Sequence, residues 1–104
     1  MATPVELNEI IKYFPKFWEE AGHLFTQTVY EESQLDRKSI ELILCSLLAA
    51  KRWETGVKVH VGLAREHGAS PGEIRGALLL ATGVAGLSAS VQSLHWAEEV
   101  LTQH

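Results

Sequence analysis

Two ionisable side chains, Glu41 and His60, stand in stretches of the chain that are otherwise apolar. Glu41 interrupts the run IELILCSLLAA at residues 40–50, and His60 is flanked by valines in VKVHV at residues 57–61. A carboxylate buried without a partner is costly, so Glu41 needs a cation, a hydrogen-bond donor or a proton. We predict that His60 is this partner, because a carboxylate that orients an imidazole makes a minimal pair for general acid–base catalysis. The alternative is structural: a packed histidine and a solvated glutamate.

The single cysteine of the chain, Cys45, lies one helical turn after Glu41 and on the same helix face. The neighbouring carboxylate and the apolar surroundings are both expected to raise the pKa of its thiol and to weaken it as a nucleophile. The chain has no second cysteine with which an oxidised sulfur could be resolved. We therefore interpret Cys45 as a small buried hydrophobic residue. The alternative is a one-cysteine peroxidase that is resolved by an external thiol.

Helices are expected to position these side chains, because helical periodicity dominates and no strand alternation of any length occurs. We predict an all-α protein of five or six helices. The helix that starts after the N-cap Asp36 is almost wholly apolar, so it is expected to be buried nearly all round. Ser70 and Glu73 stand at capping-box spacing, with Pro71 at the first helical position. The predicted inner face of the last helix consists of Val91, Leu94, Ala97 and Leu101. The predicted segments span residues 5–14, 17–29, 37–50, 54–66, 71–84 and 88–102.

Length and composition predict one folded domain, residues 1–104, with 46% apolar and 21% charged residues. The net charge of −4 and the scattered basic residues argue against a nucleic-acid partner. No apolar run approaches the roughly 20 residues that cross a bilayer, and MATPVELNEI lacks the features of a signal peptide. The single cysteine excludes an internal disulfide and fits a reducing cytoplasm. Because a chain this short often gains stability by association, we expect a homo-oligomer.

Three segments of the sequence resemble a known family in their order and spacing. They are LDRKSIELI at residues 35–43, His60, and LAREHGASPGEIRGALLLATGVAG at residues 63–86. This set resembles the carboxymuconolactone decarboxylase family, which also contains the AhpD-type alkylhydroperoxidases. The resemblance implies a small all-α, AhpD-like fold. It also implies assembly into trimers or hexamers, often by pairing of protomers into dimers.

The resemblance also assigns individual positions. In the peroxidase branch, a Glu is followed twelve residues later by the first Cys of a C-x-x-C pair, and a His lies four residues after the second Cys. Glu41 matches the Glu and His60 matches the His, whereas Trp53 and Gly56 stand at the two Cys positions. Disulfide-based reduction needs both thiols, so two-cysteine peroxidase activity is not expected. The decarboxylase branch does not use the cysteine pair.

The functional hypothesis is therefore a decarboxylase or related acid–base enzyme, with Glu41 and His60 as catalytic residues and a small carboxylated organic molecule as substrate. In a decarboxylation, His60 would donate a proton and Arg52 or Lys51 would hold a substrate carboxylate. One alternative is an AhpD-like, thiol-dependent peroxidase that relies on Cys45. Another is a non-catalytic oligomeric member of the family.

Trp53 and Gly56 are the predicted substrate-binding residues. The Trp53 ring would line a pocket beside Glu41 and His60, the alternative being that it packs in a subunit interface. Gly56 would allow close helix approach or leave the space that a thiol fills elsewhere in the family. We expect no cofactor and no bound metal, because no H-x-x-x-H spacing supports a zinc site.

Overall fold

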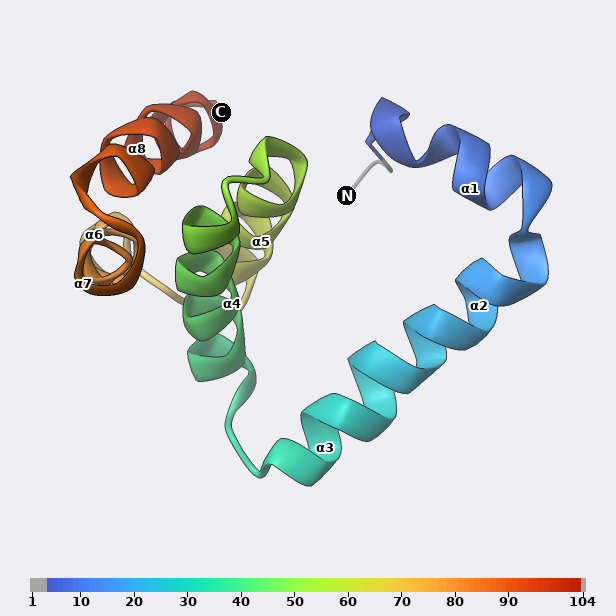
Figure 1. Cartoon of the computed structure of the whole chain (residues 1–104). Helices are drawn as coiled ribbons and strands as arrows, with labels where there is room; N and C mark the ends of the chain where they lie inside the picture. The colour runs from blue at the N-terminus through green and yellow to red at the C-terminus, as the bar shows by residue number, and fades with distance from the viewer. Residues whose placement is uncertain (1–3, 104) are drawn as a thin grey trace. The chain divides into compact units, whose positions relative to one another are not determined.

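The computed structural model describes residues 4–103. All regular secondary structure in this range is helical, which confirms the all-α class predicted from the sequence. The chain divides into two compact units at the junction between Asp36 and Arg37. Each unit is described here by itself (Figure 1).

The first unit is a succession of short helical segments without a core of its own. Pro15 occupies the first position of its second α-helix and separates it from the preceding one at Phe14, where the backbone is not helical. No described residue of this unit is buried, and the aromatic rings of Phe17 and Phe25 are more than half exposed. Its apolar side chains therefore remain uncovered. The segments are η1 (Val5–Leu7), α1 (Asn8–Tyr13), α2 (Pro15–His23), the π-helical η2 (Leu24–Val29) and α3 (Tyr30–Ser33).

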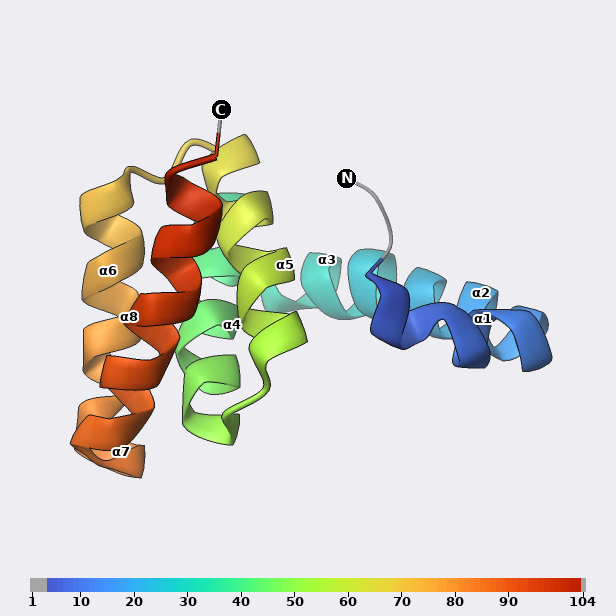
Figure 2. The same cartoon turned by 90° about the horizontal axis from the view of Figure 1, so that it is seen from above.

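The second unit is a four-helix bundle. In the order α4, α5, α8 and α6, each helix packs against the next, and α6 packs back against α4 (Figures 1 and 2). The core between them is built from small and branched side chains. Its buried members are Cys45, Ala49, Val57, Val61, Ala64, Ala69, Ile74, Leu78, Ala81 and Ala97. The elements are α4 (Arg37–Lys51), α5 (Glu54–Glu66), α6 (Pro71–Leu80), the short α7 (Thr82–Ala85) and α8 (Leu87–Leu101).

The helix boundaries of this unit follow local signals in the sequence. The predicted capping box is confirmed: the Glu73 amide donates to Ser70 Oγ at 3.0 Å, and the Ser70 amide donates to the Glu73 carboxylate at 2.9 Å. The helix that it starts ends at Leu80, earlier than predicted, and α7 follows after Ala81. Gly86 then adopts a φ of 88°, a left-handed value that glycine tolerates, and separates α7 from α8.

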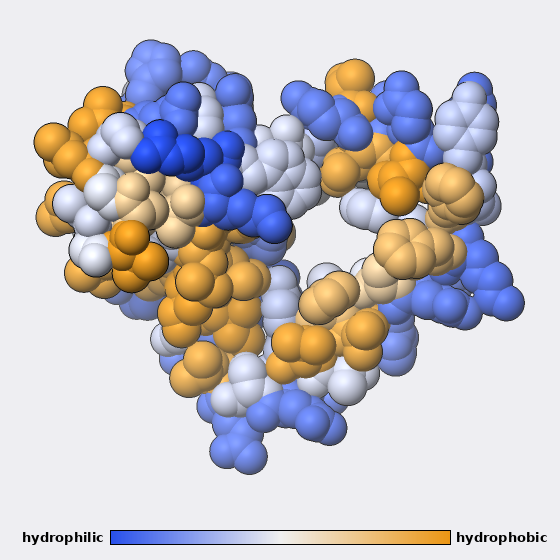
Figure 3. All heavy atoms as spheres, in the orientation of Figure 1, coloured by the Kyte–Doolittle hydropathy of each residue, from blue (hydrophilic) through white to orange (hydrophobic). Residues whose placement is uncertain are grey.

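The expectation that the helix after Asp36 is buried nearly all round is wrong for this chain. Ile43 is 46% exposed and Leu47 is 59% exposed, whereas Ile40, Cys45 and Ala49 are buried. A helix in a four-helix bundle touches its neighbours along one side, and α4 carries apolar residues on its outer side as well. Figure 3 shows apolar side chains gathered over α4 on the visible face.

The predicted inner face of the last helix is also partly wrong. Val91 is 59% exposed, and the buried residues of α8 are Ala89, Ser90, Ser93 and Ala97. The two serines are buried because their hydroxyls have partners: Ser90 Oγ donates to the Leu78 carbonyl at 2.8 Å, and Ser93 Oγ donates to the Ser90 carbonyl. A hydrogen-bonded serine is small enough for close helix packing, so hydrophobicity alone misplaces this face.

Candidate active site

The centre of the candidate site is a direct contact between Glu41 on α4 and His60 on α5. His60 Nδ1 lies 2.5 Å from Glu41 Oε1. The two helices are neighbours in the bundle, joined by a short turn at Arg52 and Trp53, so residues 19 apart in the chain meet across their interface. The Glu41 side chain is fully buried, and that of His60 is 21% exposed. The contact predicted between these two residues is therefore present.

A third residue, Arg37, completes the cluster. Its Nε donates a hydrogen bond of 2.7 Å to Glu41 Oε2, from one helical turn earlier in α4. Burial opposes ionisation of the Glu41 carboxyl, but the hydrogen bonds from His60 and Arg37 outweigh it, and the pKa of Glu41 is lowered from its usual value of 4.5. Glu41 is thus a carboxylate held by one donor on each oxygen. Sequence analysis did not single out Arg37, although its i, i+4 spacing to Glu41 was a usable signal.

The geometry of His60 defines what the pair can do chemically. When Nδ1 donates its proton to the carboxylate, the lone pair of the neutral imidazole is on Nε2. Glu41 stabilises the imidazolium that forms when Nε2 takes up a proton, as the carboxylate partner of a catalytic histidine does. Because part of the His60 ring reaches the surface while Glu41 does not, His60 is the member of the pair that a molecule from solution can approach.

Cys45 behaves as the sequence indicated. Its side chain is fully buried in the core of the bundle. Burial and, secondarily, the charge of Glu41 raise the pKa of the Cys45 thiol from 9.0 to about 12. A thiol with this pKa is almost entirely protonated at neutral pH, and the thiolate is the nucleophilic form. The structure therefore confirms that the surroundings of Cys45 make it a poor nucleophile.

Trp53 and Gly56 lie against each other at the start of α5. Trp53 is the N-cap residue of this helix and is 44% exposed. A Cβ atom added to Gly56 would lie 2.7 Å from Trp53 Cε3 and 2.8 Å from Leu48 Cδ2, both closer than real Cβ contacts. The indole and the leucine thus occupy the space above the glycine. One helical turn separates Gly56 from His60, so this packing lies next to the pair along α5.

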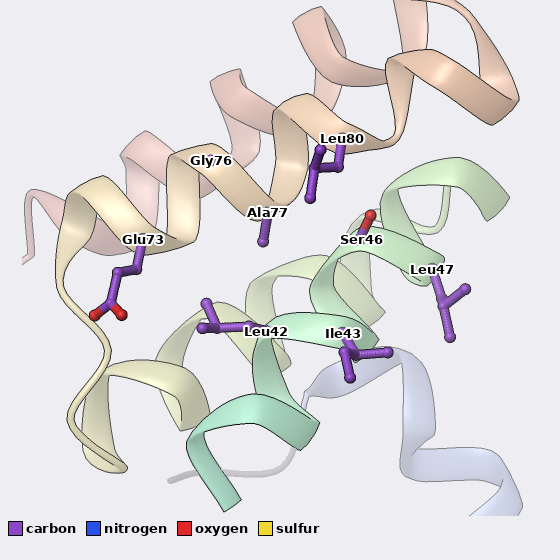
Figure 4. Close-up of a pocket in the computed structure, with 8 residues that line it drawn as sticks. All are labelled: Leu42, Ile43, Ser46, Leu47, Glu73, Gly76, Ala77 and Leu80. Atoms are coloured by element: carbon purple, nitrogen blue, oxygen red, sulfur yellow. The ribbon is translucent and has the colours of Figure 1, made fainter. Parts of the chain in front are cut away.

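The apolar groove between α4 and α6 lies apart from the Glu41–His60 pair. It has a volume of about 580 Å³. Figure 4 shows its residues on the two helices: Leu42, Ile43, Ser46, Leu47, Glu73, Gly76, Ala77 and Leu80. Ile43 is two residues beyond Glu41 and therefore about 200° around the helix axis. Glu41 and the groove consequently face different neighbours of α4: α5 on one side, and α6 and the surface on the other.

Arg52, a proposed carboxylate-holding residue, is engaged elsewhere. Its guanidinium donates to Ser88 Oγ on α8, and it lines a second groove together with Leu87, Ser88, Val91 and Gln92. His60 is not among the residues that line this groove. The structure therefore does not bring Arg52 and His60 into one groove.

Within residues 4–103, no three histidine, cysteine, aspartate or glutamate side chains come together in a way that could hold a metal ion. Over the same residues, each helix is too short or too polar to cross a membrane.

Fold and site together define a class: a small all-α protein with a buried glutamate–histidine pair between two adjacent helices of a bundle. The family model of the carboxymuconolactone decarboxylase family matches residues 15–99. The chain belongs to this family, which confirms the sequence resemblance, and the match includes residues of both compact units. No curated protein and no solved structure gives a significant match to the chain.

Proposed function

We propose that the protein is an acid–base enzyme, a decarboxylase or a close relative, that acts on a small carboxylated organic molecule. The observation that carries this proposal is the 2.5 Å contact between His60 Nδ1 and the fully buried Glu41 carboxylate. Such a pair is suited to proton transfer, because the carboxylate fixes the imidazole tautomer and balances the charge that forms. Membership of the carboxymuconolactone decarboxylase family supports a lactone acid as the first substrate class to examine.

In this proposal, His60 carries the proton and Glu41 supports it. When the carbon–carbon bond to the substrate carboxylate breaks, CO₂ leaves and the electron pair moves into the conjugated carbonyl system as a dienolate. The imidazolium of His60 then donates its Nε2 proton to carbon, and water restores that proton. Trp53 and Gly56, one turn and more before His60 in α5, are proposed to form the wall against which the substrate lies.

A direct assay tests this function. Purified protein is incubated with carboxymuconolactone and with related lactone acids, and CO₂ release is measured for the wild type, His60→Gln and Glu41→Gln. We expect kcat to fall about 10²–10⁴-fold in His60→Gln, the range that general acid–base groups supply. Lys58→Gln is a matched control on the same helix, since Lys58 forms surface ion pairs with Glu54 and Glu99. Undiminished turnover in His60→Gln would overturn the proposal.

The thiol-dependent peroxidase alternative has less support. Cys45 is fully buried and its pKa is raised to about 12, so the required thiolate is scarce. Turnover of an organic hydroperoxide with an external thiol, abolished in Cys45→Ser, would favour this alternative over the acid–base proposal.

We also propose that the protein works as a homo-oligomer, a trimer or hexamer, in which a second copy covers the α4–α6 groove. The groove is lined mainly by aliphatic side chains, and Leu47 and Leu80 are 59% and 73% exposed. The first unit adds further apolar side chains and buries none of its described residues. A contiguous apolar surface of this kind is typical of an interface between subunits.

A further inference from the structure

The Glu41 carboxylate is held at two points that come from different helices. Oε1 contacts His60 Nδ1 on α5, and Oε2 accepts a hydrogen bond from Arg37 Nε on α4. A carboxylate held at one oxygen can rotate about its last side-chain bond, because such sp²-terminated torsions are broad. The bond to Arg37 removes this freedom, and Oε1 is left directed at the imidazole. Arg37 and Glu41 are one turn apart on the same helix, so the backbone fixes their separation.

The charge of Arg37 complements this geometry. A buried glutamate and a histidine can share a proton in two ways, as carboxylate and imidazolium or as carboxylic acid and neutral imidazole. A guanidinium keeps its charge throughout the accessible pH range, so its attraction always favours the carboxylate. The groups that face Glu41 are Arg37 and the Cys45 thiol on its own helix and His60 on α5. Of these, the arginine is the permanent cation.

We propose that Arg37 is a positioning residue that locks the Glu41 carboxylate toward His60, so that His60 alone exchanges protons with the substrate. This inference rests on the proposed acid–base function of the pair and adds a third member to it. It assigns Glu41 the role of a fixed anion. It distinguishes Arg37 from Arg75, whose bidentate pair with Glu98 joins α6 and α8 on the exposed surface and serves no such purpose.

Substitution of Arg37 tests the proposal with a readout that does not depend on catalysis. In protein labelled with ¹³C at glutamate side-chain carboxyls, the Glu41 signal is followed from pH 8 to pH 3 in the wild type, Arg37→Gln, Arg37→Lys and Arg75→Gln. We expect the Glu41 titration midpoint to rise in Arg37→Gln, to stay close to the wild-type value in Arg37→Lys, and to be unchanged in Arg75→Gln. An unchanged midpoint in Arg37→Gln would overturn the proposal.

The second readout is kinetic. With a turned-over substrate, kcat is expected to fall about 10- to 100-fold in Arg37→Gln with little change in KM, since misplacement of a catalytic group by about 1 Å has effects of this size. Arg37→Lys should recover part of the loss. If the titration responds but no variant of His60 affects turnover, the acid–base function fails and the positioning role of Arg37 stands. If His60→Gln is inactive while Arg37→Gln matches the wild type in both readouts, the present inference fails alone.

A measurement on the unaltered protein decides the matter should Arg37→Gln fail to fold. The ¹H and ¹⁵N resonances of the Arg37 Nε–H group are expected to shift as Glu41 takes up its proton at low pH, because that bond loses its charged acceptor. Resonances that do not change across the Glu41 titration would show that the bond is absent in solution and would overturn the proposal.

Discussion

The indole ring of Trp53 packs against Gly56 so closely that a Cβ atom on the glycine would lie 2.7 Å from Trp53 Cε3. These are the two positions at which the peroxidase branch of the family is expected to carry its thiols. The replacement is a matched pair: a large ring at one position and the smallest residue at the other. The ring, with Leu48, takes up the space that a side chain at position 56 would need. The packing therefore supports a stable helix start where a disulfide would otherwise form.

Gly56→Ala is expected to destabilise the protein despite the better helix propensity of alanine. The added methyl group must displace the Trp53 ring or Leu48, and overpacking of this kind costs about 1–3 kcal/mol. The gain in helix propensity is about 1 kcal/mol, so we expect a net loss of about 1–2 kcal/mol in urea unfolding. Gly72→Ala is the control, because its new Cβ meets Ser70 Oγ at an ordinary 3.8 Å. Equal stability of the two variants would contradict the close packing.

The pH dependence of stability should carry a contribution from Glu41. Its pKa is lowered in the folded protein, so the stabilisation is present above the unfolded value of 4.5 and is lost as pH falls through the folded value. Glu41→Gln is expected to be less stable than the wild type by about 1–3 kcal/mol at pH 7, with a difference that narrows below pH 4.5. Urea unfolding between pH 7 and pH 3 measures both effects.

Glu98→Gln serves as the matched control for this experiment. Glu98 also has a lowered pKa, from its hydrogen bonds with Arg75, but it lies on the surface, where ion pairs contribute little. Its substitution should leave the pH profile of stability close to that of the wild type. A constant difference between Glu41→Gln and the wild type from pH 7 to pH 3 would show that Glu41 is not held as a carboxylate.

The Cys45 thiol should be unreactive in the folded protein. With a pKa of about 12 in place of 9.0, the thiolate is about a thousandfold rarer at neutral pH, and burial restricts access further. Alkylation by iodoacetamide at pH 8 is therefore expected to be at least about a thousandfold slower in the native state than in urea. Mass spectrometry of quenched samples gives both rates. Similar rates in the two states would favour an accessible thiol and revive the peroxidase alternative.

Self-association should depend on the α4–α6 groove. Leu47→Glu places a carboxylate in the proposed apolar contact, where its desolvation is costly, and is expected to weaken association at least about tenfold. Val84→Glu is the comparison, since Val84 is 90% exposed and does not line this groove. Sedimentation velocity over a range of concentrations measures the change. A wild-type protein that sediments as a monomer at micromolar concentration would refute the homo-oligomer.

Much of the fold was predictable because it depends on local signals. Helical periodicity indicated the all-α class, and the Ser70–Glu73 capping box marked the start of α6. Predictions failed where a helix face is chosen by its neighbours. Val91 was assigned to the inner face of α8 for its hydrophobicity, yet Ser90 and Ser93 are buried there because each finds a carbonyl acceptor.

The candidate site divides in the same way. The sequence by itself determined that Glu41 and His60 are available at family spacing, that Cys45 has no partner cysteine, and that Trp53 and Gly56 replace the thiols. Residue types and their separations along a chain are sufficient for such statements. Only the tertiary structure decided that Oε1 of Glu41 meets His60 while Oε2 meets Arg37. That outcome depends on how α4 and α5 pack, since a hydrogen bond requires ångström-level placement that no spacing along the chain encodes.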